Sequence, residues 1–183
     1  MSTQKICCAG FGGQGVLSMG KLLAYAGMLE GKEVSWCPSY GPEMRGGTAN
    51  CAIVVSDEPI GSPVITAGAT ASIVMNLPSF EKFVNIVGPG GNVILNSSLI
   101  DKKVERTDIN AYYIPANDLA KELGNPKLMN IILLGALIEV DKTVSVQACL
   151  DAFTKVFGES KAKFIPINKE ALAKGAEYVR LHH

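Results

Sequence analysis

The 183-residue sequence predicts a single α/β domain with a mostly parallel sheet and helices on both faces. Three observations indicate this class. Short apolar, β-branched runs alternate with segments whose apolar residues recur at helical spacing. Glycine or proline turns separate most of these segments. A chain of this length also normally folds around one core. Strands that alternate with helices in this way pair in parallel and are covered on both faces.

The first half of the chain is predicted to alternate strand and helix. Lys5–Ala9 is a short apolar run, and apolar residues at helical spacing follow over Gln14–Glu30. Gly31 ends that helix, and Glu33–Cys37 is predicted to be the second strand, so the chain opens with a strand–helix–strand unit. β-branched runs predict further strands at Ala49–Ser56, Val64–Thr66 and Ser72–Asn76.

The second half continues the alternation. Pro78 suits the first turn of a helix through Ile86, and a strand at Asn92–Asn96 completes a second strand–helix–strand unit. The all-round apolar character of Lys127–Val140 predicts a helix in the core or at an interface. The remaining predictions are a strand at Tyr112–Ile114, a helix at Ala116–Leu123, a helix capped by Ser145 that ends at Phe157, and a helix capped by Asn168 that covers Lys169–Leu181.

Composition excludes several partner classes. The 17 basic and 17 acidic residues balance, which argues against nucleic acid or an anionic membrane surface as a partner. The N-terminus lacks the pattern of a signal peptide, so we expect a cytoplasmic protein. No apolar run approaches the ~20 residues of a membrane helix. Charged residues make up 19% of the chain, below the roughly 25% of typical domains. This difference indicates either surface buried on other subunits or a large core.

Cysteine and histidine usage predicts no metal site and no catalytic residue in this chain. The five cysteines form no C-x-x-C pair and lie mostly in apolar runs, so we expect reduced thiols. No zinc or iron–sulfur ligand set is present. The only histidines, His182 and His183, can be the remnant of a purification tag, so the domain is taken as residues 1–181.

A glycine motif follows the first predicted strand. Gly10, Gly12, Gly13, Gln14 and Gly15 belong to a G-x-G-x-x-G pattern between strand and helix, as in Rossmann-like folds. Glycines let a ligand approach the backbone, and N–H groups at a helix start attract phosphate or carboxylate. The acid that binds ribose is expected at the end of the second strand, which reads instead Trp36-Cys37-Pro38. An NAD(P) site, another anion site, and simple tight packing of helix on strand all stay open.

A second unusual segment, SYGPEMRGGTANC, covers residues 39–51 and begins as a loop without helical or strand period. Pro42 fixes its own φ and so holds Tyr40 and Glu43 at a defined separation. Arg45 offers a planar fork to a carboxylate or phosphate, and Gly46-Gly47 permits close approach. The alternative is an intrachain ion pair of Arg45 with Glu43 or Glu58 on a solvated turn.

Several stretches together resemble the gamma subunit of 2-oxoacid:ferredoxin oxidoreductases over nearly the whole chain. They are AGFGGQGV, SYGPEMRGGTANC, SDEPIGSP, VMNLPSFEKF, GPGGNVILNSSL and PANDLAKELGNPKLMNIILLGAL. The resemblance implies a complex of anaerobic metabolism that converts a 2-oxoacid and coenzyme A to acyl-CoA and carbon dioxide while reducing ferredoxin. It implies thiamine diphosphate and magnesium on alpha and beta subunits, and [4Fe-4S] clusters on beta or a ferredoxin-like delta subunit.

The resemblance further implies roles for the two unusual segments, in a chain that is inactive alone. Coenzyme A or another anion would contact Gly10, Gly12, Gly13, Gln14, Gly15, Arg45, Gly46 and Gly47. Partner subunits would contact Tyr40, Pro42, Glu43, Met44 and Arg45. The 2-oxoacid stays open, with 2-oxoglutarate favoured by the short, separate gamma chain, and the isolated chain can self-associate. Two other functions remain: a free-standing nucleotide-binding module, and a scaffold that touches no ligand.

Overall fold

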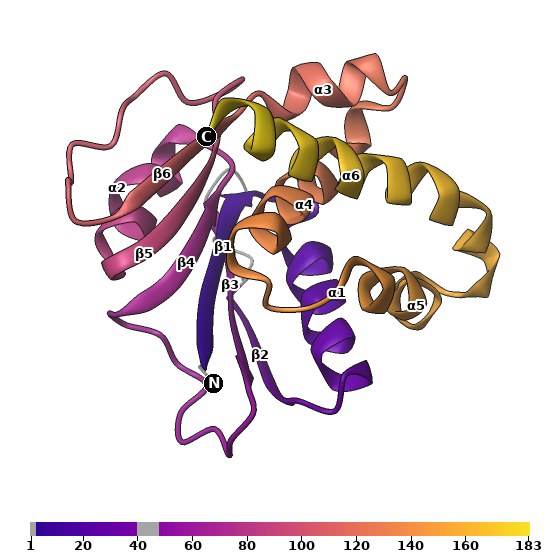
Figure 1. The fold of residues 1–183 in the computed structure, drawn as a ribbon, viewed down its shortest axis with the longest axis horizontal. Coiled ribbons are helices and arrows are strands. Elements are labelled where there is room, and N and C mark those ends of the chain that lie inside the picture. The colour runs from indigo at the N-terminus through magenta and orange to yellow at the C-terminus, as the bar shows by residue number, and fades with distance from the viewer. Residues whose placement is uncertain (1–2, 40–47) are drawn as a thin grey trace.

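The computed structural model describes residues 3–39 and 48–183 and contains a six-stranded sheet (Figure 1). The strand order across the sheet is β2-β3-β1-β4-β5-β6. The strands are β1 (Gln4–Phe11), β2 (Glu33–Ser39), β3 (Thr48–Ser56), β4 (Ala69–Val74), β5 (Val87–Asn96) and β6 (Asn110–Ile114). Apart from the edge strands β2 and β6, the strands are rich in buried aliphatic residues or cysteine, which is the composition of strands covered by helices.

The sheet is mostly parallel, as predicted. The pairs β1/β4, β4/β5 and β5/β6 are parallel, whereas β3 is antiparallel to both of its neighbours, β1 and β2. The opening of the chain therefore differs from a simple strand–helix–strand unit. β1 and β2 run in the same direction, but β3 returns between them and separates them. The second predicted unit, β4 with its helix and β5, is confirmed.

Helices cover both faces of the sheet. The helices are α1 (Val16–Leu29), α2 (Leu77–Asn85), α3 (Ala116–Glu122), α4 (Met129–Asp141), α5 (Val146–Phe157) and α6 (Ile165–His182). Two short 3-10 helices, η2 (Pro126–Leu128) and η3 (Glu159–Phe164), precede α4 and α6. α1 and α4 pack on one face with α5 and α6 against them, and α2 packs on the other (Figure 1).

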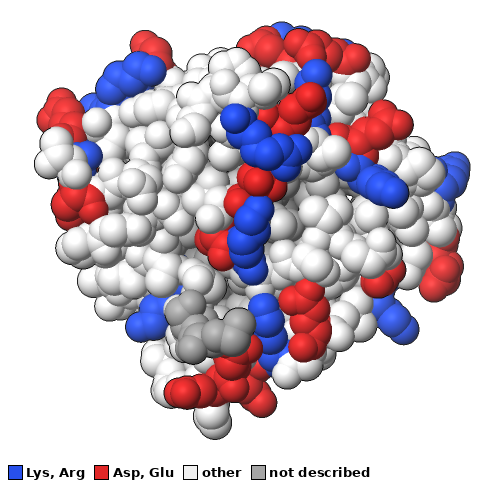
Figure 2. All heavy atoms as spheres, viewed as in Figure 1, with Lys and Arg blue, Asp and Glu red and all other residues white. Residues whose placement is uncertain are grey.

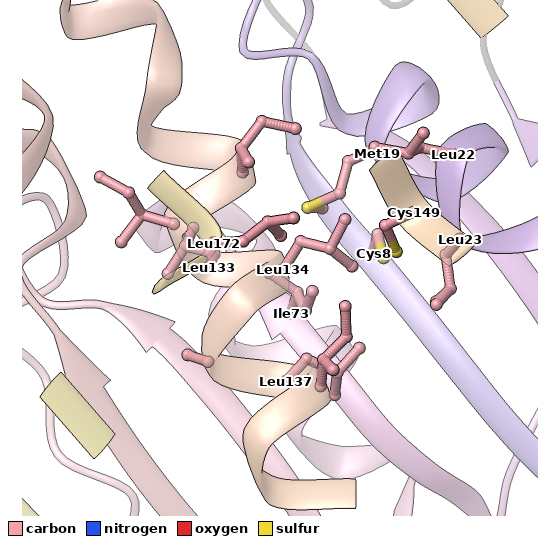
Figure 3. Packing of buried hydrophobic residues seen from close by; sticks show 14 of the residues in the cluster. Cys8, Met19, Leu22, Leu23, Ile73, Leu133, Leu134, Leu137, Cys149 and Leu172 are labelled. Atoms are coloured by element: carbon pink, nitrogen blue, oxygen red, sulfur yellow. The ribbon is translucent and has the colours of Figure 1, made fainter. Parts of the chain in front are cut away.

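Alternating strand side chains divide the core between the two faces. Ile6 and Cys8 of β1 face the layer of α1 and α4, whereas Cys7 and Ala9 face the side covered by α2. Figure 3 shows part of the larger cluster, to which Met19 and Leu22 of α1, Leu134 and Leu137 of α4, and Ile73 of β4 all belong.

Helix α4 lies in the core, as its all-round apolar sequence predicts. Every residue of Met129–Ile138 is buried. The helix packs against the sheet on one side and against α6 on another. The approach of α4 to α6 depends on two glycines, because a Cβ at Gly135 would overlap the backbone of Leu172 and one at Gly175 would overlap the backbone of Ile132. Close backbone contact of this kind leaves no room for any side chain.

Three sequence predictions of local structure need correction. Val64–Thr66 forms no strand, since this short run between Pro63 and Gly68 lies in the connection from β3 to β4. Helix α6 begins at Ile165 rather than after Asn168, whose side-chain amide instead donates a hydrogen bond to the Phe164 carbonyl (2.7 Å). Helix α1 begins at Val16, because the left-handed residue Gly15 precedes it.

Charged residues of both signs lie side by side on the face drawn in Figure 2. No helix in the described part of the chain is both long enough and apolar enough to cross a bilayer.

Candidate functional site

The glycine turn follows β1 at the carboxyl edge of the sheet, the edge at which the parallel strands end. The Phe11 N–H donates to the side-chain oxygen of Gln14 (2.7 Å), and the Gln14 N–H donates to the Phe11 carbonyl (3.2 Å). Gly13 and Gly15 both have positive φ, at 90° and 78°. Gln14 therefore closes the turn with its own side chain, which is a structural role that the motif alone did not specify.

Two of the glycines are required by sterics. An ideal Cβ at Gly10 would lie 2.6 Å from the Gln14 side-chain oxygen, 2.9 Å from Val16 Cγ2 and 3.0 Å from Met75 Cβ. A Cβ at Gly15 would overlap the side-chain amide of Asn130, at a backbone conformation that side chains rarely adopt. Tight packing of helix on strand is thus part of the motif's role.

The same turn also leaves a hollow at the start of α1. Its volume is about 340 Å³, and its described lining is Phe11, Gly12, Gly13, Gly15, Val16, Leu17, Ser18 and Ala49. No side chain of the described residues caps α1, and its first turn contains no acidic residue. Because the first N–H groups of a helix lack intrahelical partners and carry positive partial charge, this hollow suits a phosphate or carboxylate.

Asn130 supports the turn from behind and was missed by the sequence analysis. It is 7% exposed, donates from Nδ2 to the Gly15 carbonyl (3.3 Å), and accepts through Oδ1 from the Ile131 N–H (2.9 Å). Its signal in the sequence is a single amide inside the apolar run LMNIILLGAL. A buried polar residue in such a run needs a hydrogen-bond partner, and here that partner is the glycine turn.

Two further buried asparagines follow the ends of the parallel strands. Asn76 after β4 caps α2 by accepting from the Ser79 N–H (3.0 Å), while its Nδ2 has no partner among the described residues. Asn96 at the end of β5 donates to the side-chain oxygen of Asn117 (2.8 Å), and its own Oδ1 has no described partner. The carboxyl edge therefore holds buried amide groups with unused hydrogen-bonding capacity.

The second predicted segment starts and ends at this same edge. Ser39 at the end of β2 pairs with Asn50, and Thr48 at the start of β3 pairs with Phe11 of the glycine turn. Thr48 thus lies on the strand next to β1, and Ser39 lies two strands away from β1. The predicted site residues Tyr40, Pro42, Glu43, Met44, Arg45, Gly46 and Gly47 lie outside the described residues.

The described residues bring together no three His, Cys, Asp or Glu side chains at metal-binding distances. Burial raises the pKa of the Cys7 and Cys149 thiols to about 12, so both stay protonated near neutrality. The hydrogen bond with Cys51, together with burial, raises the pKa of Cys8 as well. These thiols are buried among the core side chains.

The fold and this edge define an α/β domain whose glycine turn suits an anion and whose described residues form no metal-ligand cluster. The family model of pyruvate ferredoxin/flavodoxin oxidoreductases matches residues 5–178, and the chain therefore belongs to this family. The resemblance drawn from the sequence motifs is confirmed.

Two relatives show how the chain relates to whole proteins of the family. Ketoisovalerate oxidoreductase subunit VorA from Methanothermobacter marburgensis is 38% identical over 96% of this chain but only 36% of its own length. This chain thus spans about a third of that protein. The 2-oxoglutarate synthase subunit KorC from Methanocaldococcus jannaschii is 32% identical, and the match covers 97% of this chain and 94% of KorC.

Solved structures share the fold. The gamma subunit of a keto/oxoacid ferredoxin oxidoreductase from Geobacter sulfurreducens has a TM-score of 0.81 and 26% identity, over 97% of this chain and 99% of that one. The 2-oxoglutarate:ferredoxin oxidoreductase from Magnetococcus marinus, solved with 2-oxoglutarate, coenzyme A and succinyl-CoA, has a TM-score of 0.87 at 24% identity. That match covers 100% of this chain and 32% of the other, and at this identity it supports the fold alone.

Proposed function

We propose that this chain is the gamma component of a 2-oxoacid:ferredoxin oxidoreductase. The observation that carries the proposal is the family match over residues 5–178, together with the match to KorC over nearly the full length of both chains. The complex would cleave carbon dioxide from a 2-oxoacid, transfer the acyl group to the sulfur of coenzyme A, and pass the released electrons to ferredoxin. Relatives named for ketoisovalerate and for 2-oxoglutarate leave the 2-oxoacid open.

The described part of the chain offers no ligand cluster for the metal-containing cofactors of this reaction. It has no three-residue metal-ligand cluster, and burial keeps Cys7 and Cys149 protonated. The proposal therefore assigns thiamine diphosphate, magnesium and the [4Fe-4S] clusters to alpha, beta and delta partner subunits. This chain contributes binding surfaces to a shared site rather than a reacting group.

The carboxyl edge is the proposed contact region. Backbone N–H groups at the start of α1 would bind an anionic group, either a phosphate of coenzyme A or a carboxylate of a partner subunit. The segment anchored at Ser39 and Thr48 would contact the alpha or beta subunit, with Arg45 paired to a phosphate or carboxylate. The pairing of Thr48 with Phe11 supports this, because it brings one end of the segment beside the glycine turn.

Co-expression with alpha and beta subunits of a 2-oxoacid:ferredoxin oxidoreductase from the same organism tests the assembly. We expect co-purification of the subunits, and electron transfer from a 2-oxoacid to a viologen dye that depends on coenzyme A. Failure to co-purify with any thiamine-binding subunit would overturn the proposal. Loss of the dye reaction when this chain is omitted, with recovery when it is added back, would support it.

Two glycine variants separate ligand contact from stability. Gly13 lines the hollow at φ +90°, whereas Gly31 follows α1 at φ +73°, and a Cβ at either position meets no atom within 4 Å. Replacing either by Ala should cost about 1 kcal/mol of stability, since both need a left-handed backbone. Only Gly13→Ala should raise the KM for coenzyme A, if the anion is on coenzyme A. Equal kinetics for the two variants would favour the scaffold role instead.

The glycine motif also favours a second candidate function, a free-standing nucleotide-binding module. Against it, β3 separates β2 from β1, so that the end of β2 is not adjacent to the glycine turn. Titration of the isolated chain with NADH distinguishes the two, because micromolar binding would favour the module and its absence is expected for a subunit.

A further inference from the structure

A second hollow lies on the far side of Asn130, among the helices rather than at the sheet edge. It has a volume of about 300 Å³, equal to about ten water molecules at ~30 Å³ each. Residues of η2, the start of α4, α5, η3 and the start of α6 line it. Its apolar wall consists of Leu128, Ile131, Phe153, Phe157, Phe164 and Ile167. A mostly apolar and aromatic wall with a few polar groups is the usual lining of a small-molecule site.

The polar groups of this hollow favour a negative ligand. Lys127 and Lys161 line it, and its described lining contains no carboxylate. Neither lysine forms an ion pair with a described residue. Phe164 is 38% exposed, with Lys161 Nζ 5.6 Å from its ring centre. An apolar hollow that reaches solvent beside two unpaired cations can therefore pair an anion while burying an apolar body.

We propose that this hollow binds a small monoanion with an aromatic or branched aliphatic body, such as an aryl or alkyl carboxylate. The body would pack among the three phenylalanines, and the carboxylate would lie at the rim beside Lys127 and Lys161. A neutral molecule of the same shape would leave both lysines unpaired. The site is separate from the proposed assembly role and does not depend on it.

Asn130 connects this hollow to the glycine turn. Asn130 lines the hollow, and its side-chain amide donates to the Gly15 carbonyl (3.3 Å). A ligand that packs against Asn130 would restrict this amide and with it the residue that precedes α1. Occupation of the hollow should therefore be detectable at the glycine turn, although the ligand does not touch the turn.

Titration of the full 183-residue chain with 4-phenylbutyrate, followed by amide chemical shifts, tests the site. We expect saturable shifts in the first turns of α4 and α6, and markedly weaker binding of the neutral analogue 4-phenylbutanol. Lys161→Gln should weaken binding about three- to fivefold, the range of a partly exposed ion pair. The matched control is Lys163→Gln, because Lys163 lies at a similar distance from the Phe164 ring (5.3 Å) but does not line the hollow.

A blocking variant keeps the test decisive. Ile167→Trp places a larger side chain at a half-buried position of the wall and should abolish the shifts without unfolding the chain. Shifts at Gly15 and Val16 on ligand addition should disappear in Asn130→Ala, while binding itself persists. The proposal is overturned by any of three results: no saturation below about 10 mM, equal binding of acid and alcohol, or equal effects of the two lysine variants. Shifts that appear only when a partner subunit is added would also overturn it, in favour of a protein-docking surface.

Discussion

Replacement of Asp141 by Asn should remove a specific part of the pH dependence of stability. Asp141 ends α4, accepts from the Thr143 N–H through Oδ1 (3.0 Å), and has a buried Oδ2 without a partner among the described residues. Burial raises the pKa of this carboxyl from 3.8 to about 6, and the hydrogen bond from the Thr143 N–H and the charges of Lys142 and Lys32 offset this only in part.

The sign and magnitude follow from the raised pKa. Protonation of Asp141 favours the folded state, because the folded pKa lies above the unfolded value. The stabilising contribution is fully present below about pH 4 and is lost as the pH rises through about 6. A shift of roughly two units at ~1.4 kcal/mol per unit corresponds to about 3 kcal/mol. Asn cannot ionise, so the stability of the variant does not fall in this way as the pH rises.

Urea unfolding of both proteins at several pH values between about 4 and 7 measures the effect. The stability of Asp141→Asn relative to the wild type should rise by about 2 kcal/mol over this range, most of the full effect. The difference between the two proteins is needed, because other carboxyls act in the opposite direction: the hydrogen bond from Arg106 lowers the pKa of Asp108. Asp57→Asn, at an exposed position lining the same hollow as Asp141, supplies the baseline. A difference that does not change with pH would refute the reasoning.

Three further substitutions test the packing. Gly135→Ala should cost about 3 kcal/mol of stability or prevent folding, because its Cβ would overlap the Leu172 backbone. Thermal unfolding measures this cost, and a value below about 1 kcal/mol would contradict the packing argument. Ser145→Ala should cost about 1 kcal/mol in urea unfolding, since its hydroxyl accepts from the backbone N–H three residues on (3.1 Å); no change would show that the cap is not formed. Gly15→Ala should cost less in an Asn130→Ala background than alone, and equal costs in a double-mutant cycle would disprove their contact.

The fold was predictable where the signal is local. Periodicity and turn residues are properties of neighbouring positions, so most strands and helices, the turn at Gly10–Gly15 and the helix cap at Ser145 could be placed from the sequence. The position of β3 could not. Its β-branched run is compatible with either direction, and the preceding loop fixes no direction by itself. Whether β3 pairs with β1 depends on interactions across the whole sheet rather than on the sequence of β3 alone.

The candidate site was predictable only in part for the same reason. The sequence pattern indicates that these positions require glycine, but it does not show which group lies against Gly15. That group is Asn130, 115 positions away. Asn76 and Asn96 likewise look like ordinary polar residues at strand ends. Their burial and their partners depend on how α2 and α3 return to the sheet.

The antiparallel direction of β3 brings Thr48, which follows residues 40–47, next to the glycine turn. β2 runs in the direction of β1, so Ser39 leaves the sheet at the carboxyl edge. A following parallel strand would have to start at the opposite edge, and the chain would cross the sheet to reach it. Because β3 instead runs antiparallel, it starts at the edge where β2 ended, and its first residue, Thr48, pairs with Phe11. The reversal of one strand therefore fixes Ser39 and Thr48, which flank residues 40–47, at the carboxyl edge, with Thr48 beside the glycine turn, whatever partner or ligand that edge binds.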